Sequence, residues 1–131
     1  MTPGAQARYQ EMDLLTMPAE KRVVFLYTQL LVQLRFARAS SGPAAIEERS
    51  ERLLRAQTIV NELLVSLDHE HGGPIAAQLA GLYAFFLREL MSVRGDDARL
   101  DRLIDMAAQL HAAWDVAATQ ALAAQRSAVG A

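Results

Sequence analysis

Apolar residues recur at alternating steps of three and four along most of this chain, a spacing that places them on one side of an α-helix. The most regular seam consists of Leu100, Leu103, Ala107, Leu110, Trp114 and Ala117. A second seam with the same spacing consists of Leu53, Ala56, Val60, Leu63 and Leu67. Seams of this kind face a partner helix, and strand signals are nearly missing. The pattern therefore predicts an all-α protein.

Clusters of glycine, proline and serine divide the periodic sequence into segments. Helices are predicted over residues 18–39, 44–69, 74–93 and about 97–118, with breaks at residues 40–43, 72–74 and 94–96. Gly95 is expected at the C-terminus of the third helix. Short connections between helices of similar length favour antiparallel neighbours. The predicted fold is an antiparallel up-down-up-down four-helix bundle.

The two ends of the chain lie outside these segments. Residues 1–15 contain Pro3 and Gly4 and lack periodicity, so they are predicted to form a flexible N-terminal arm. Residues 119–131 are mostly alanine and polar residues, and are predicted to be a tail that continues as helix, forms a short extra helix or frays. A chain of 131 residues suits one domain and is too short for two of ordinary size.

Composition excludes several classes of function. The formal net charge is −2 and no basic block occurs, so a nucleic-acid partner is not expected. Cysteine is absent, which excludes disulfides and thiolate metal sites. No uncharged apolar run approaches the ~20 residues that span a bilayer, and the start of the chain lacks the apolar core of a secretory signal. The expected location is the cytoplasm, without direct membrane insertion.

No constellation of catalytic residues occurs in the sequence, and neither an enzyme nor a cofactor is expected. His69 and His71 invite a metal-site interpretation, but two histidines at i and i+2 do not share one face of a helix. A metal-binding bundle enzyme would also need inward pairs of glutamate and histidine. No metal ligands are therefore assigned.

The stretch from Gly73 to Leu87 carries more apolar surface than one bundle seam can bury. Its only strongly polar side chain is that of Gln78. A helix that is apolar all round has to be buried all round, and large apolar patches often mark partner sites. Six residues are candidates for a partner-binding groove: Ile59, Leu64, Val65, Leu79, Tyr83 and Phe86. The alternative is that the arm, the tail or a second copy of the chain covers this surface, so the free protein is either a monomer or a homodimer.

Several stretches of the chain together resemble the flagellar secretion chaperone FliS family. The family signature reads A-x-x-I-I-x-E-L, then L-D, then G-G-x-I-A-x-x-L-x-x-L-Y. The matching stretches here are residues 56–63, residues 66–68, residues 72–76, Leu79, Leu82, Tyr83 and Leu90. Tyr9, Pro18 and Trp114 also occupy matching places, so the likeness spans most of the chain.

The resemblance implies a cytosolic export chaperone that binds the disordered C-terminal segment of flagellin. It would prevent premature polymerisation and deliver flagellin to FlhA, the gate protein of the flagellar type III export apparatus. Tyr9 matches a tyrosine in the arm that the family uses to cover the groove and to dock to the export gate. A second hypothesis is a four-helix regulatory or signalling bundle that binds a partner protein to control flagellar assembly.

Overall fold

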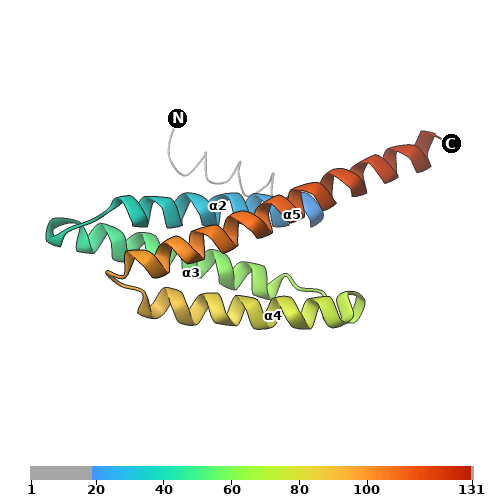
Figure 1. Cartoon of the computed structure of the whole chain (residues 1–131). Helices are drawn as coiled ribbons and strands as arrows, with labels where there is room; N and C mark the ends of the chain where they lie inside the picture. The colour runs from blue at the N-terminus through green and yellow to red at the C-terminus, as the bar shows by residue number, and fades with distance from the viewer. Residues whose placement is uncertain (1–18, 131) are drawn as a thin grey trace, which may run out of the picture.

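The computed structural model describes residues 19–130, which form helices joined by short connections (Figure 1). The helices are α2 (Ala19–Ala39), α3 (Ile46–Val65), α4 (His69–Ser92) and α5 (Asp97–Gly130), and a short 3-10 helix η1 (Pro43–Ala45) precedes α3. No strand occurs within residues 19–130. The predicted all-α four-helix bundle is confirmed. The predicted arm, including Tyr9, lies outside the described residues.

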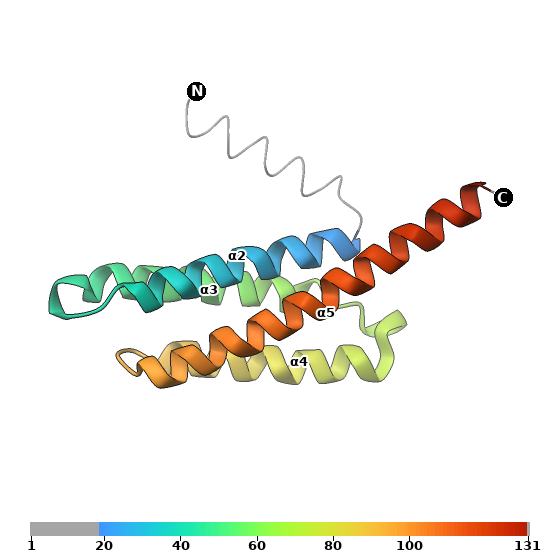
Figure 2. The ribbon, with the colours of Figure 1, turned by 45° about the horizontal axis from the view of Figure 1, so that its top comes forward.

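Helix α2 packs against both α3 and α5, and α3 also packs against α4. The colours of Figure 1 show α2 and α4 running in one direction and α3 and α5 in the other. Figure 2 shows the same arrangement from a second side, with α4 at the edge of the bundle. Helix α4 thus has α3 as its main neighbour.

The core is built from the seams of all four helices. Its largest fully buried side chains are those of Tyr27, Leu30, Leu34, Val60, Leu63, Phe86, Val93 and Leu100. Full burial of a side chain of this size contributes roughly 1.5–3 kcal/mol relative to exposure. In α3 the buried residues Leu53, Ala56, Val60 and Leu63 follow the predicted seam.

The junction between α3 and α4 differs from the prediction. Helix α3 ends at Val65 rather than His69, and α4 begins at His69 rather than Pro74. The reason is Asp68, whose carboxylate accepts hydrogen bonds from the backbone N–H groups of Glu70 and His71, both at 3.1 Å. An aspartate at this N-cap position stabilises a helix start. The signal was present in the sequence, but the glycines that follow it suggested a break instead.

The two glycines after this first turn bend α4, and each is required for a different reason. Gly73 has φ 51° and ψ −131°, a conformation that side chains with a Cβ rarely adopt. Gly72 has an ordinary φ, but a Cβ there would lie 2.8 Å from the Cβ of Ala76. Pro74 then resumes the helix, a position where its missing N–H is tolerated. The bend directs the rest of α4 along α3.

Gly73→Ala is expected to destabilise the protein by roughly 1–3 kcal/mol, because alanine is strained at this φ and ψ. Gly81 supplies the matched control, since it lies in the same helix and a Cβ there would meet nothing within 4 Å. Gly81→Ala is expected to stabilise the helix by up to about 1 kcal/mol. Urea unfolding of the two variants measures both effects. If Gly73→Ala were as stable as the wild type, glycine would not be required at position 73.

The turn between α4 and α5 differs in one detail from the prediction. The left-handed residue that ends α4 is Arg94, with φ 39°, and not Gly95. The backbone N–H of Asp96 donates to the carbonyl of Val93 at 2.7 Å, which closes the turn around Arg94 and Gly95. Asp96 then caps α5 by accepting from the N–H of Arg99 at 3.1 Å. An arginine in this conformation is uncommon and strained.

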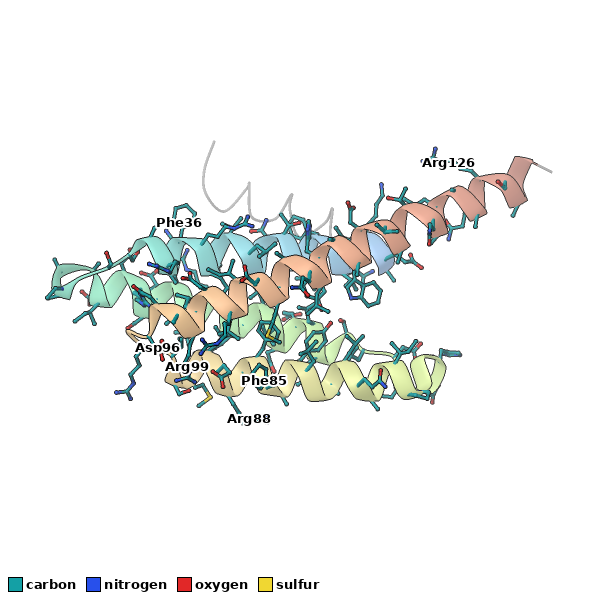
Figure 3. The ribbon with its side chains drawn as sticks, in the orientation of Figure 1. Phe36, Phe85, Arg88, Asp96, Arg99 and Arg126 are labelled. Carbon is teal, nitrogen blue, oxygen red and sulfur yellow. The ribbon has the colours of Figure 1, made fainter. Side chains whose placement is uncertain are left out.

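Helix α5 extends well past its predicted end near residue 118. It continues to Gly130 and projects beyond the other helices (Figure 1). Of the alternatives predicted for residues 119–131, the structure shows continuation of the fourth helix as far as Gly130. Alanine has the highest helix propensity, and neither glycine nor proline interrupts the sequence between Asp97 and Gly130. Figure 3 shows Arg126 on this projecting part.

Candidate functional site

An apolar groove lies at the end of the bundle where α3 passes into α4. Its volume is about 190 Å³. The apolar groove is lined by Val23 of α2, Trp114 of α5, Leu63 and the α3–α4 connection, and the residues Gly72, Ile75, Ala76, Leu79 and Tyr83 of α4. Four different helices therefore contribute to it, and nearly all of its walls are apolar.

The bend in α4 sets the shape of the apolar groove. The N-cap at Asp68 and the bend at Gly73 place one turn of α4 across the end of α3. After the bend, Ala76 is buried on the floor, whereas Ile75 is 65% exposed at the edge. A small residue on the floor lets an incoming backbone approach closely, as recognition of a helix in a groove requires.

Tyr83, which lines the apolar groove, is hydrogen-bonded to Tyr27 in the core behind it. The hydroxyl groups of Tyr27 and Tyr83 lie 2.7 Å apart and share a hydrogen bond, and both rings are almost completely buried. Burial raises the pKa of both tyrosines above the ordinary value of 10.0, because the phenolate would lose its hydration. A hydrogen bond from Trp114 acts in the opposite direction on the pKa of Tyr27. At neutral pH both tyrosines are uncharged.

Only some of the six residues predicted for the groove line it in the structure. Leu79 and Tyr83 line it, although Tyr83 is also part of the core. Phe86 is fully buried in the core, away from the groove lining. Ile59 and Leu64 are half-buried and pack against the core from α3. Val65 is 76% exposed at the last position of α3, next to Ser66 of the groove.

Most of the lining residues were not among the predicted groove residues, and Val23, Ile75 and Trp114 are examples. Ile75 lies within the matched stretch of residues 72–76, so its place in the FliS signature could have pointed to it. Trp114 follows the seam of α5, but it is only half-buried because the apolar groove opens beside it. Val23 belongs to the first turns of α2, and nothing in the sequence around it indicates that it meets residues of α3 and α4.

Apolar side chains other than those of the groove also remain exposed. On α4 they include Met91, and half-buried Phe85 lies on the same helix (Figure 3). On α2, Phe36 is half-exposed and stacks against the guanidinium of Arg52, 4.6 Å from the ring centre. The excess apolar surface that the sequence predicted for the third helix is thus only partly covered by the described residues.

The described residues offer no metal site and no membrane span. Nowhere in residues 19–130 do three or more histidine, cysteine, aspartate or glutamate side chains gather closely enough to hold a metal ion. His71 instead contacts Asp68, with Nδ1 2.8 Å from Oδ2. No described helix is both long enough and apolar enough to cross a membrane.

Comparison with known proteins identifies the family of the chain. The family model described as flagellar protein FliS matches residues 1–121. The flagellar secretion chaperone FliS of Vibrio cholerae is 31% identical over 94 residues, which are 66% of this chain and 69% of the relative. The protein of the same name from Campylobacter jejuni is 30% identical over 97 residues, which are 72% of this chain and 76% of the relative. The chain therefore belongs to the FliS family of flagellar proteins, which is a family of chaperones and not of enzymes.

Proposed function

We propose that this protein is a cytoplasmic export chaperone that binds the disordered C-terminal segment of flagellin, prevents its premature polymerisation and delivers it to the export gate protein FlhA. The relatives named flagellar secretion chaperones support the general role. The observation that carries the proposal is the apolar groove, because signature residues including Asp68, Gly72 and Leu79 position or line it.

The groove suits one side of an amphipathic helix. Such a helix presents apolar residues at i, i+3 or i+4 and i+7, and the open walls formed by Leu67, Ile75 and Leu79 are apolar. A volume of about 190 Å³ holds a few apolar side chains rather than a whole segment. Binding in the groove would therefore anchor the cargo, and the exposed apolar surface of α4 would extend the contact.

The role needs no chemistry beyond binding. A segment that is disordered when free loses conformational entropy on binding, and the burial of apolar surface offsets this cost. Once ordered on the bundle, the segment can no longer pair with other flagellin molecules. The proposed activity is therefore that of a binding protein, without a catalytic step or a cofactor.

The N-terminal arm is proposed to regulate access to the groove. It contains Tyr9, Met12, Leu14 and Leu15 and lies outside the described residues. Residue Ala19, where α2 begins, is only four residues before Val23 of the groove wall, so the arm is tethered close to the site. In this proposal the arm covers the groove when cargo is absent, and displaced Tyr9 contacts the export gate when cargo is bound.

Titration with a peptide that covers the last ~40 residues of flagellin tests the proposal. Such a peptide would be about 60 Å long if fully helical, at 1.5 Å per residue, which is enough to follow the bundle. Binding is expected to increase the helical signal in circular dichroism beyond the sum of the free components. Calorimetry at several temperatures should give a large negative heat-capacity change from buried apolar surface.

Two outcomes would contradict the chaperone proposal. No binding of the peptide at micromolar concentrations would remove flagellin as the cargo. Binding without any gain in helicity would argue against folding on the bundle. A pull-down from flagellated cells distinguishes the alternative of a regulatory bundle, which would retain a regulator while flagellin stayed unbound.

A further inference from the structure

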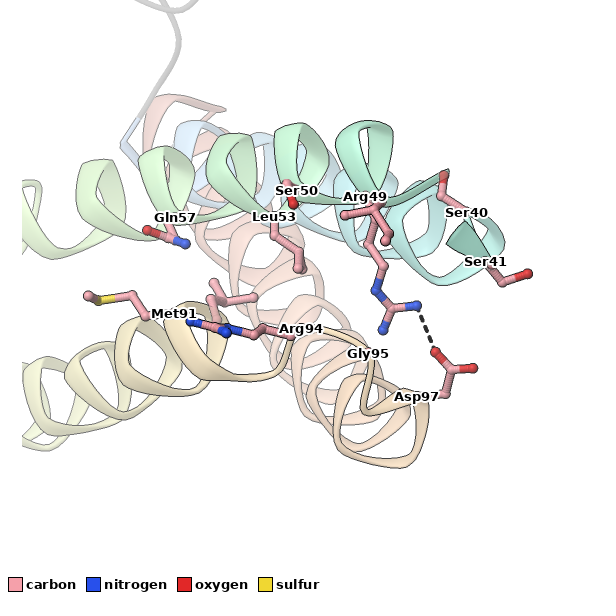
Figure 4. Close-up of a pocket in the computed structure, with 13 residues that line it drawn as sticks. Ser40, Ser41, Arg49, Ser50, Leu53, Gln57, Met91, Arg94, Gly95 and Asp97 are labelled. Atoms are coloured by element: carbon pink, nitrogen blue, oxygen red, sulfur yellow. Dashed lines mark hydrogen bonds and ion pairs between the residues drawn. The ribbon is translucent and has the colours of Figure 1, made fainter. Parts of the chain in front are cut away.

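A larger pocket lies at the opposite end of the bundle from the apolar groove. It has a volume of about 750 Å³ and opens where the start of α3 faces the end of α4 and the α4–α5 turn (Figure 4). Ligand pockets commonly measure about 300–1,000 Å³. The lining combines apolar side chains, among them Leu53, Leu90 and Met91, with the charged groups of Arg49, Arg94 and Asp97. We call it the Arg49 pocket.

Arg49 is unusually buried for an arginine in a small protein. Only 9% of its side chain is exposed, and its Nη1 donates to Oδ1 of Asp97 at 2.7 Å. Its Nε and Nη2 are buried and have no hydrogen-bond acceptor among the described residues. Buried N–H groups without acceptors cost free energy, and the great majority in folded proteins have partners. Arg49 therefore has unused binding capacity.

The two free nitrogen atoms form one edge of the guanidinium group. The N–H bonds of Nε and Nη2 point in the same direction, and this pair is the fork that binds both oxygens of a carboxylate. Nη1, which carries the bond to Asp97, belongs to a different edge. Figure 4 shows the guanidinium beside Asp97, in the space between α3 and the end of α4. A bidentate carboxylate would satisfy both groups at once.

The charges around the pocket leave room for one additional negative charge. Asp97 is shared, because its second oxygen lies 3.3 Å from Nη1 of Arg38. The lining residues Arg49 and Arg94 carry two positive charges, and Asp97 is the single acidic residue of the lining. The hydrogen bond from Arg49 lowers the pKa of Asp97, so this carboxylate stays ionised at neutral pH. A monoanion would balance the remaining charge.

Two long, unbranched side chains lie at the mouth of the pocket. Met91 is 68% exposed and Arg94 is also exposed, and Figure 4 shows both side chains extending between α3 and α4. Because the free edge of Arg49 is shielded from solvent, a ligand can reach it only after a lining side chain moves. Side chains such as Met91 and Arg94 change rotamer readily. The strained backbone of Arg94 adds a feature that is common at binding sites.

We propose that the Arg49 pocket binds a carboxylate attached to an aliphatic group, with the carboxylate on the Nε–Nη2 edge of Arg49 and the aliphatic group against Leu53, Leu90 and Met91. The site is separate from the apolar groove and does not depend on flagellin binding. The carboxylate belongs to a small organic acid, to an acidic side chain of a peptide or to a peptide C-terminus, and the experiment distinguishes these sources.

Nuclear magnetic resonance of the full ¹⁵N-labelled chain tests the site through the Nε–Hε signal of Arg49. The first probe is 4-methylpentanoate, and 4-methylpentanamide is its uncharged control. A saturable shift of the Arg49 signal is expected with the acid and not with the amide. The signal of exposed Arg35 serves as the internal control. Two further probes are an amidated peptide with a Leu-Glu pair and a free-acid peptide without acidic side chains.

Arg49→Lys keeps the positive charge but loses the fork, and is expected to weaken binding of 4-methylpentanoate by roughly tenfold. The wild-type titration decides the question even if this variant fails to fold. A shift with only one of the three probes that carry a carboxylate identifies the source of the ligand. The proposal is overturned if no carboxylate shifts the Arg49 signal, or if the amide or Arg35 shows the same response.

Discussion

Ile75→Glu is expected to weaken binding of the C-terminal flagellin peptide by about a hundredfold or more while the protein stays folded. Ile75 lines the apolar groove and is 65% exposed in the free protein, so a glutamate there remains hydrated until cargo arrives. Bound cargo would then bury the carboxylate among apolar side chains without a partner. An unpaired buried charge costs several kcal/mol, and each 1.4 kcal/mol corresponds to tenfold in affinity.

Leu54→Glu is the matched control for this experiment. Leu54 is 61% exposed on α3 and lines neither the apolar groove nor the Arg49 pocket. Calorimetric titration and thermal melting should show normal binding for Leu54→Glu and a melting temperature close to wild type for both variants. If Ile75→Glu bound the peptide as well as Leu54→Glu does, the cargo would have to dock elsewhere on the bundle.

The spacing of apolar residues in the seams predicted the helices because each helix buries one side against a neighbouring helix. In α3 and in the first half of α5 the polar residues leave only one possible apolar side, and Leu53, Val60, Leu100 and Leu103 are buried as their seams predicted. The seam of α5 fails further along, where Trp114 is only half-buried. The apolar groove opens beside Trp114, and α5 projects beyond the other helices only after the buried Ala118. Periodicity in one helix carries no information about where its partner ends.

Helix α4 shows where the pattern becomes ambiguous. Its apolar residues surround the helix, so their spacing alone selects no inner side. The buried side runs through Ala76, Tyr83, Phe86 and Leu90, and Ile75 faces outward. A helix that is apolar all round has no preferred inner side. The choice is made by contacts with distant residues, above all the hydrogen bond between the hydroxyl groups of Tyr83 and Tyr27, which lie 56 positions apart in the chain.

The Arg49 pocket could not be predicted from sequence for a related reason. Arg49 and Arg52 both occur in the charged first turns of α3, and each looks like a surface residue of a helix. Only the packed structure buries Arg49 against the α4–α5 turn, where Asp97 pairs with it. The charge pair of Glu48 with Arg52, at i and i+4, can be expected from helical spacing alone and is present. Local pairs follow from helical spacing, whereas burial of a charge follows from tertiary packing.

The buried tyrosine pair is expected to cause a steep loss of stability above pH 10. Burial raises the pKa of Tyr27 and Tyr83 in the folded protein, whereas in the unfolded chain both ionise near pH 10. Because the pKa of each tyrosine is higher in the folded protein than in the unfolded chain, the stability that the pair contributes is fully present below pH 10. It is lost as the pH rises from there towards the folded pKa, because the unfolded state releases protons that the folded state retains. Each tyrosine then lowers the free energy of unfolding by up to about 1.4 kcal/mol per pH unit.

Urea unfolding at pH 8, 10 and 11 measures this loss in the wild type and in the double variant Tyr27→Phe/Tyr83→Phe. The variant removes both hydroxyls together, so neither is left buried without its partner, and at pH 8 its stability is expected to change by less than that of either single variant. Between pH 10 and 11 the wild type should lose up to about 2 kcal/mol from the two phenols, since each is only half ionised in the unfolded chain at pH 10, and the variant should lose much less. Ultraviolet absorbance should show that Tyr27 and Tyr83 ionise together with unfolding. An equal loss of stability in the double variant would mean that other groups govern the alkaline transition, and that the hydroxyl pair is accessible to hydroxide in the folded state.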